Sequence, residues 1–153
     1  MTWIKLCSVL FLSLNLMFTG CKSQPNEEVY ISDFYNIHEE YKDAWGNVGK
    51  YDISLPYIHC DSKSAKKLNQ TIKNEYKDLV DSLDEAKEEG YTLPDTKVSY
   101  DVYTHSNLLS LVIKEEVETE YPRYKVYHFD SKTKKRVSNK KLYKKYKISQ
   151  KDM

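Results

Sequence analysis

The chain has 153 residues, of which 31% are charged and 40% are hydrophobic, and it contains 14 tyrosines but only four glycines and four prolines. This length allows one ordinary domain, and the glycine, proline and cysteine counts exclude the collagen-like, low-complexity and disulfide-scaffold classes. The 24 basic and 23 acidic side chains are too balanced for a chain that binds nucleic acid, so we expect no nucleic-acid partner.

The first 20 residues have the pattern of a signal peptide. One basic side chain precedes an apolar run over residues 6–18, which is shorter than the roughly 20 residues that a membrane-spanning helix needs. Thr19, Gly20 and Cys21 then resemble the lipobox of bacterial lipoproteins, where the cysteine is acylated and the chain is cut before it. The alternative is an ordinary signal peptide followed by an incidental cysteine. We expect a lipoprotein with palmitate-type acyl chains on Cys21, held at the outer face of the cell membrane.

The mature chain divides into three parts by pattern and charge. Residues 21–46 carry acids and scattered aromatics without a sustained period, so we expect a lipidated tether in which residues 29–35 pair weakly at a sheet edge. Residues 47–130 are clearly periodic and should form the folded domain. Residues 131–153 hold ten basic side chains and one acid, a net charge of +9, whereas residues 21–130 hold 13 basic and 22 acidic side chains, a net charge of −9.

The most regular pattern predicts one long helix of about 25 residues. Apolar residues recur every three or four positions from Ala65 to Ala86. Asp61 or Ser62 offers an N-cap before this run, and Gly90 offers a stop after it.

Alternating apolar residues predict strands over residues 51–55, 98–102, 109–113 and 124–128, the last with Tyr124, Val126 and His128 on its apolar face. Pro56 should end the first strand or confine it to a sheet edge. Short connections among the last three strands predict antiparallel pairing. The elements together predict an α+β fold, in which one long helix packs on an antiparallel three- to four-stranded sheet in the order β-α-β-β-β, followed by a short C-terminal helix from Ser138.

Two stretches of the chain resemble a known group of extracellular domains. The first is YDISLPYI, residues 51–58, followed by DS at 61–62 and AKKLNQTIKNEY at 65–76. The second is YHFD, residues 127–130, followed by TKKRVSNKKL at 133–142. Both resemble the N-terminal portion of an extracellular domain of unknown function from low-GC bacteria, found ahead of polysaccharide deacetylase domains and in the outer region of lysozyme-sensing anti-sigma factors.

This resemblance covers about residues 48–150 and rests on structural motifs rather than catalytic ones. It implies that Asn69 caps or bridges within the helix–sheet layer, and that Asp130 and Thr133 build a turn. Because no deacetylase sequence follows within the 153 residues, the resemblance implies no deacetylase activity. The chain is then either a free-standing module or a truncated, non-catalytic relative of a deacetylase-linked or lysozyme-binding protein that has lost its effector domain.

The sequence offers no strong catalytic or metal-binding pattern. It has no G-x-S-x-G, no H-E-x-x-H and no glycine-rich phosphate loop. His59, Cys60 and Asp61 are consecutive, but neighbouring strand side chains point to opposite faces and seldom converge on one ion. Cys60 fits a small buried hydrophobic residue, and His105 and His128 fit ordinary strand residues that could meet across the sheet. We therefore expect no enzyme activity, no cofactor and no metal site.

Tyrosines on the expected strands are the candidate ligand-binding residues, and they are Tyr100, Tyr103, Tyr121, Tyr124 and Tyr127. Those that face away from the helix would form an aromatic surface suited to a glycan or a protein, although tyrosine is also a favoured strand residue. The acidic body would attract a cationic, lysozyme-like muramidase, whereas the basic segment would attract anionic wall polymer or lipid headgroups. The sequence thus predicts a lipid-anchored binding or sensing module of the cell envelope, with a muramidase, peptidoglycan or anionic wall polymer as its partner.

Overall fold

The computed structural model describes residues 28–146 of the chain, so the predicted signal peptide, Cys21 and the rest of residues 1–27, and residues 147–153, lie outside it. The elements in chain order are β1 (Tyr30–Lys42), β2 (Val48–His59), α1 (Lys63–Glu89), β3 (Thr96–His105), β4 (Leu108–Val117), β5 (Arg123–Asp130), β6 (Lys135–Val137) and α2 (Asn139–Tyr146). The expected α+β class, the long helix and the short C-terminal helix are confirmed.

The strands form one mixed sheet in the order β1-β2-β3-β4-β5-β6. Neighbouring strands are antiparallel except β2 and β3, which run parallel because the crossover helix α1 returns the chain between them. The expected antiparallel sheet of three to four strands is therefore a mixed sheet of six strands. β6 was not predicted from the sequence. β1 was predicted only as a weak pairing of residues 29–35 at a sheet edge, and it is an edge strand of 13 residues.

β1 lies where a tether was expected. The sequence pattern places residues 21–46 outside the domain, whereas residues 30–42 pair with β2 along nearly their whole length. The row of half-buried apolar residues keeps one alternation through the bulge at Phe34, but Asp33 and Glu39 interrupt it with charges. The residues of this row are also only half-buried, so the apolar period is weak in the sequence. The folded unit therefore begins before residue 47.

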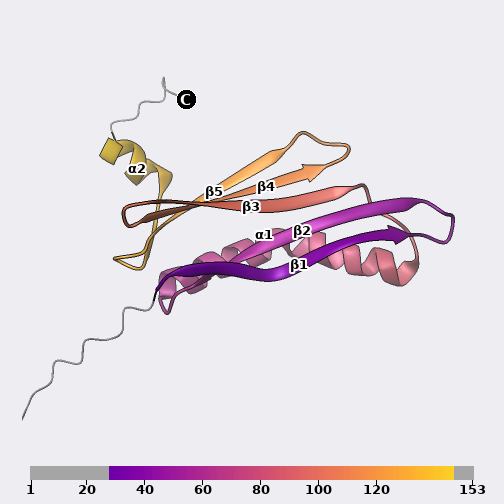
Figure 1. Cartoon of the computed structure of the whole chain (residues 1–153), viewed down its shortest axis with the longest axis horizontal. Coiled ribbons are helices and arrows are strands. Elements are labelled where there is room, and N and C mark those ends of the chain that lie inside the picture. Colours follow the sequence, from indigo (N-terminus) through magenta and orange to yellow (C-terminus); the bar gives the residue numbers. More distant parts are fainter. Residues whose placement is uncertain (1–27, 147–153) are drawn as a thin grey trace, which may run out of the picture.

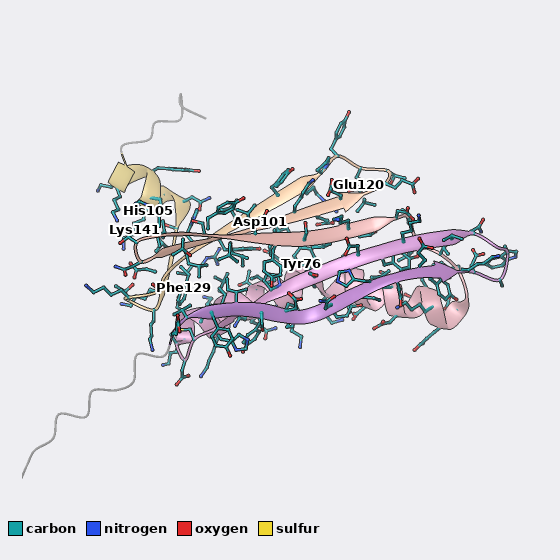
Figure 2. The ribbon with its side chains drawn as sticks, in the orientation of Figure 1. Tyr76, Asp101, His105, Glu120, Phe129 and Lys141 are labelled. Carbon is teal, nitrogen blue, oxygen red and sulfur yellow. The ribbon has the colours of Figure 1, made fainter. Side chains whose placement is uncertain are left out.

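α1 is defined by local signals at both ends. The side chain of Ser62 accepts a hydrogen bond from the Ala65 amide at 3.0 Å, and Gly90 ends the helix in the left-handed region at φ 78°. One face of the helix is buried against the sheet, through Ala65, Leu68, Asn69, Ile72, Tyr76, Leu83 and Ala86. Figure 2 shows Tyr76 between the helix and the sheet. The long amphipathic helix is thus confirmed with both of its predicted ends.

β2 and β3 stay together only near their starts. Residues 51–53 pair with residues 96–98, and the strands then separate, as Figure 1 shows for the hairpin β1–β2 and the strands β3–β5. Beyond the separation, Asn69 of α1 takes the place of a strand partner for Ile58. The Asn69 amide oxygen accepts a hydrogen bond from the Ile58 N–H, and the Asn69 amide nitrogen donates one to the Ile58 carbonyl, both at 2.9 Å. Asn69 therefore bridges the helix and the sheet, as expected.

The separation also explains how β2 continues through Pro56. Backbone groups of residues two apart point to the same edge of a strand, and those of Ile58 point away from β1, toward Asn69. The nitrogen of Pro56 thus lies on the edge that β3 has already left, where no ladder hydrogen bond is lost. Of the two expectations for Pro56, the strand end is wrong, and the edge position holds only locally, because β2 is an interior strand whose side toward β3 is unpaired at Pro56.

The last strand, β6, contacts the start of α1. A turn joins β5 to β6, in which the Thr133 amide donates to Asp130 Oδ1 at 2.7 Å, as expected for these two residues. Beyond this turn the amide of Arg136 in β6 donates to Ser64 Oγ at 2.7 Å. Both edges of the sheet therefore contact α1 or its side chains, and the apolar core lies between the helix and one sheet face.

Candidate functional site

The sheet formed by β3, β4 and β5 has a face that α1 does not cover. Residues opposite each other in neighbouring strands share a face, so the register defines the outer face, the side turned away from α1. Its rows are Tyr103, Ser110 and His128; Asp101, Val112 and Val126; and Ser99, Lys114 and Tyr124. No described element packs over the middle of this face.

The five candidate tyrosines do not form one surface. Tyr103 and Tyr124 lie on the outer face, where they are 59% and 61% exposed. Tyr121 is 93% exposed in the connection between β4 and β5. Tyr100 and Tyr127 lie on the face toward α1, so they cannot contribute to the same contact.

Tyr100 and Tyr127 instead hold parts of the fold together. The Tyr100 hydroxyl donates to Asp33 Oδ1 at 2.6 Å, and the Tyr127 hydroxyl donates to Glu75 of α1. Burial, helped by the hydrogen bond to Asp33, raises the pKa of Tyr100 to about 12. Burial and the Glu75 carboxylate likewise raise the pKa of Tyr127. These two residues are structural.

The apolar face expected for β5 was assigned with the wrong phase. Tyr124 and Val126 are exposed on the outer face, whereas Tyr127 and Phe129 are buried toward α1. Both sets alternate along the strand and both are largely apolar, so period two alone cannot choose between them. The consequence is an outer face that carries more apolar surface than a solvent-facing sheet usually does.

The outer face combines apolar and polar groups with little net charge. Val112 and Val126 are cross-strand partners at its centre. Lys114, opposite Tyr124, pairs with Glu116 at 2.8 Å, and the hydrogen bond to Glu116 raises the pKa of Lys114. The surface can therefore bury aromatic and aliphatic area around the paired Lys114 and Glu116, which suits a non-covalent contact.

Two serine–histidine pairs were not anticipated from the sequence. Ser110 Oγ lies 2.9 Å from His128 Nδ1 on the outer face, and Ser32 Oγ lies 2.7 Å from His59 Nε2 in the hairpin. Only the strand register brings these residues together, so spacing along the chain gave no signal. Burial lowers the pKa of His128, which favours its neutral form. Among the described residues neither imidazole has a carboxylate partner to orient it, as a catalytic triad requires.

The remaining histidines lie apart from this pair. His105 lies at the end of β3 close to Lys141 of α2 (Figure 2), and it lines a different hollow from the His128 row. His38 Nδ1 lies 2.5 Å from Asp52 Oδ1 in the hairpin, with the imidazole still largely exposed. His105 and His128 therefore lie on strands as ordinary strand residues, the interpretation that the sequence favoured, and no hydrogen bond joins them within the described residues.

Metal ligands do not gather within residues 28–146, where no group of three His, Cys, Asp or Glu side chains could hold an ion. Cys60 is a free, half-buried cysteine that packs against the core after β2. The same part of the chain contains no helix with the length and apolar character that crossing a membrane demands.

The chain matches no protein-family model, and no curated protein matches it. The resemblance to the extracellular domain of deacetylase-linked proteins and anti-sigma factors therefore stays a prediction.

Proposed function

We propose that the chain is a non-catalytic binding module of the bacterial cell envelope, anchored through lipid on Cys21, which contacts its ligand with the outer face of β3–β5. The observation that carries the proposal is the pair of exposed tyrosines on that face, Tyr103 and Tyr124, on either side of the paired Val112 and Val126. Tyrosines of this kind supply much of the affinity at protein and glycan contacts, because each offers a large rigid ring with a polar tip.

The ligand class follows from charge as well as from shape. Residues 21–130 carry 22 acidic and 13 basic side chains, so the body of the molecule attracts cationic partners. A cationic muramidase would meet this body faster at low salt, and its binding would weaken as salt rises. Contact of a glycan with the tyrosines of the outer face would instead depend little on salt, because tyrosine carries no charge at neutral pH. We propose a muramidase or wall glycan as the ligand.

The test measures binding of the full chain in detergent to lysozyme, to purified peptidoglycan and to an anionic teichoic polymer, each at low and high salt. Tyr103→Ala and Tyr124→Ala should each weaken binding to the true ligand about fivefold or more, as central contact residues do. Trp45→Ala is the matched control, because Trp45 is an exposed aromatic in the β1–β2 connection, away from the outer face.

Three results would count against the proposal. Absence of binding to all three ligands, by a chain shown to be folded, would contradict a binding function. Equal losses in Trp45→Ala and Tyr103→Ala would contradict the assigned face. Binding only to the anionic polymer, lost when residues 132–153 are deleted, would move the function to the basic segment.

A further inference from the structure

A groove lies between α1 and the hairpin β1–β2, on the opposite side of the sheet from the outer face. One hollow of about 480 Å³ is lined by Phe34, Tyr57, Lys66, Asn69, Gln70 and Lys73. A second hollow of about 470 Å³ shares Phe34, Gln70 and Lys73 with it and continues along the helix past Leu55 and Val80. We call the two together the hairpin groove.

The strand side of the hairpin groove is aromatic. Phe34 and Tyr57 are each 37% exposed, although both are large apolar rings. The row of rings continues beyond the hollow, since Tyr57 meets His59 edge-on with ring centroids 4.9 Å apart, and Tyr30 stacks on His59 at 4.2 Å. Open aromatic rings in a row offer flat apolar surfaces to the C–H faces of sugar rings.

The helix side of the hairpin groove is cationic. Residues 63–77 of α1 contain five lysines and one acid, whereas residues 78–89 contain six acids and one lysine. This distribution opposes the helix macrodipole, which favours acids near the N-terminus, and so it costs stability rather than adding to it. A positive first half of α1 is therefore better explained by a ligand than by the needs of the helix.

Lys73 is the lysine best placed to bind a ligand. Lys66 pairs with Asp61 at 2.6 Å, and Lys77 pairs with Asp81. Lys73 is exposed, lines both hollows and makes no ion pair with any described residue. Its ammonium group can therefore bind an anionic group without first giving up a partner.

Two exposed amides in the lining of the hairpin groove supply hydrogen-bonding groups. Gln70 donates its Nε2 to Asn74 Oδ1 at 2.6 Å, and each amide keeps further donor and acceptor capacity. The amide of Asn69 is already bound to the backbone of Ile58 and serves the fold. Gln70 and Asn74 thus complete a set of aromatic, amide and ammonium groups on one groove.

We propose that the hairpin groove binds a carboxylate-bearing saccharide, with sugar rings on Phe34 and Tyr57, hydroxyl groups on Gln70 and a carboxylate on Lys73. This proposal rests on the proposed function in one respect only, which is that the chain meets such a glycan in the cell wall. A polyol-phosphate polymer fits less well, because it has no ring faces to cover the aromatic residues. A cationic protein is disfavoured by the lysines.

The experiment uses the full chain in detergent and isothermal titration with two matched ligands. One is a tetrasaccharide of alternating N-acetylglucosamine and N-acetylmuramic acid, and the other is the N-acetylglucosamine tetramer, which lacks the carboxylates. We expect the first to bind at least about tenfold more tightly than the second. Lys73→Ala should weaken the first about fivefold or more and change the second less than about twofold. Tyr57→Ala should weaken both.

The controls separate the groove from the outer face. Lys67→Ala removes an exposed lysine of the same helix that does not line the groove, and it should leave both affinities unchanged. Tyr103→Ala on the outer face should also leave them unchanged. No binding of the muramic tetrasaccharide, equal effects of Lys73→Ala and Lys67→Ala, or tighter Lys73-dependent binding of poly(glycerol phosphate) would each overturn the proposal. If Tyr103→Ala lost binding to the wall while the wild-type chain did not bind the tetrasaccharide, the groove would not be a saccharide site. The proposed function of the outer face would still stand.

Discussion

The hydroxyl of Tyr100 in β3 donates a hydrogen bond to Asp33 of β1, although β2 lies between these two strands in the sheet. The contact is possible because β2 and β3 separate after residue 53. Asp33 lies opposite Pro56, next to the bulge in β1. The bond therefore joins the hairpin to the rest of the sheet at a point where the backbone ladder has ended.

Replacing Tyr100 by phenylalanine tests this connection. Tyr100→Phe keeps the ring and removes the donor to Asp33, so we expect the free energy of unfolding to fall by about 1 kcal/mol, measured by chemical denaturation. Tyr103→Phe is the matched control, because Tyr103 in the same strand is exposed and should change stability by less than about 0.5 kcal/mol. Equal losses in the two variants would show that the Tyr100 hydroxyl does not join the hairpin to the sheet.

Asn69 provides a second test of the separated strands. Asn69→Leu keeps a similar volume but leaves the buried N–H and C=O of Ile58 without partners, so we expect a loss of roughly 2–4 kcal/mol. Hydrogen exchange of the Ile58 amide should accelerate in the same variant.

The control for Asn69 lies on the same helix. Asn74→Leu removes only an exposed side-chain hydrogen bond with Gln70, so it should lower the free energy of unfolding by less than about 0.5 kcal/mol. If Ile58 stayed protected from exchange in Asn69→Leu, the bridging role of Asn69 would be refuted.

The parts of the fold that the sequence predicts are those with local causes. α1 could be predicted because Ser62, Gly90 and a regular apolar period act within a few residues of each position. β1 could be predicted only as a weak edge pairing over residues 29–35, because Asp33 and Glu39 interrupt its apolar alternation and its inward-facing residues are only half-buried. Pairing with β2 along nearly its whole length holds it in place. The separation of β2 from β3 depends on the amide of Asn69 reaching across from the helix, which no local pattern contains.

The candidate site was predictable only in part. The sequence identified Tyr103 and Tyr124, but it also included Tyr127, whose hydroxyl binds Glu75 across the core. Choosing between the two faces of β5 requires knowing which of Val126 and Phe129 is buried, and both are good core residues. The serine–histidine pair of the outer face likewise depends on register, because its two members come from different strands.

His128 gives a prediction about pH. Burial lowers its pKa from 6.5, so the unfolded chain takes up this proton at a higher pH than the folded chain does. The stability associated with neutral His128 is therefore fully present above about pH 6.5 and is lost as the pH falls through the lower folded pKa. We expect the free energy of unfolding to decrease less between about pH 7.5 and pH 5 in His128→Gln than in the wild type. His105→Gln, at an exposed position, should keep the wild-type slope; a wild-type slope in His128→Gln would contradict the prediction.

Anchoring through Cys21 can be tested apart from any ligand. Thr19-Gly20-Cys21 predicts acylation of the cysteine, and two or three acyl chains at about 0.8 kcal/mol per buried CH₂ hold a protein on a membrane essentially permanently. We expect the wild-type chain to take up labelled palmitate and to sediment with membranes, and Cys21→Ser to do neither. Cys60→Ser is the matched control, since it removes a cysteine of the folded domain and should leave both labelling and sedimentation unchanged. Labelling that persists in Cys21→Ser would show that the lipobox interpretation is wrong and that the binding surfaces act on a chain held in the envelope by other means.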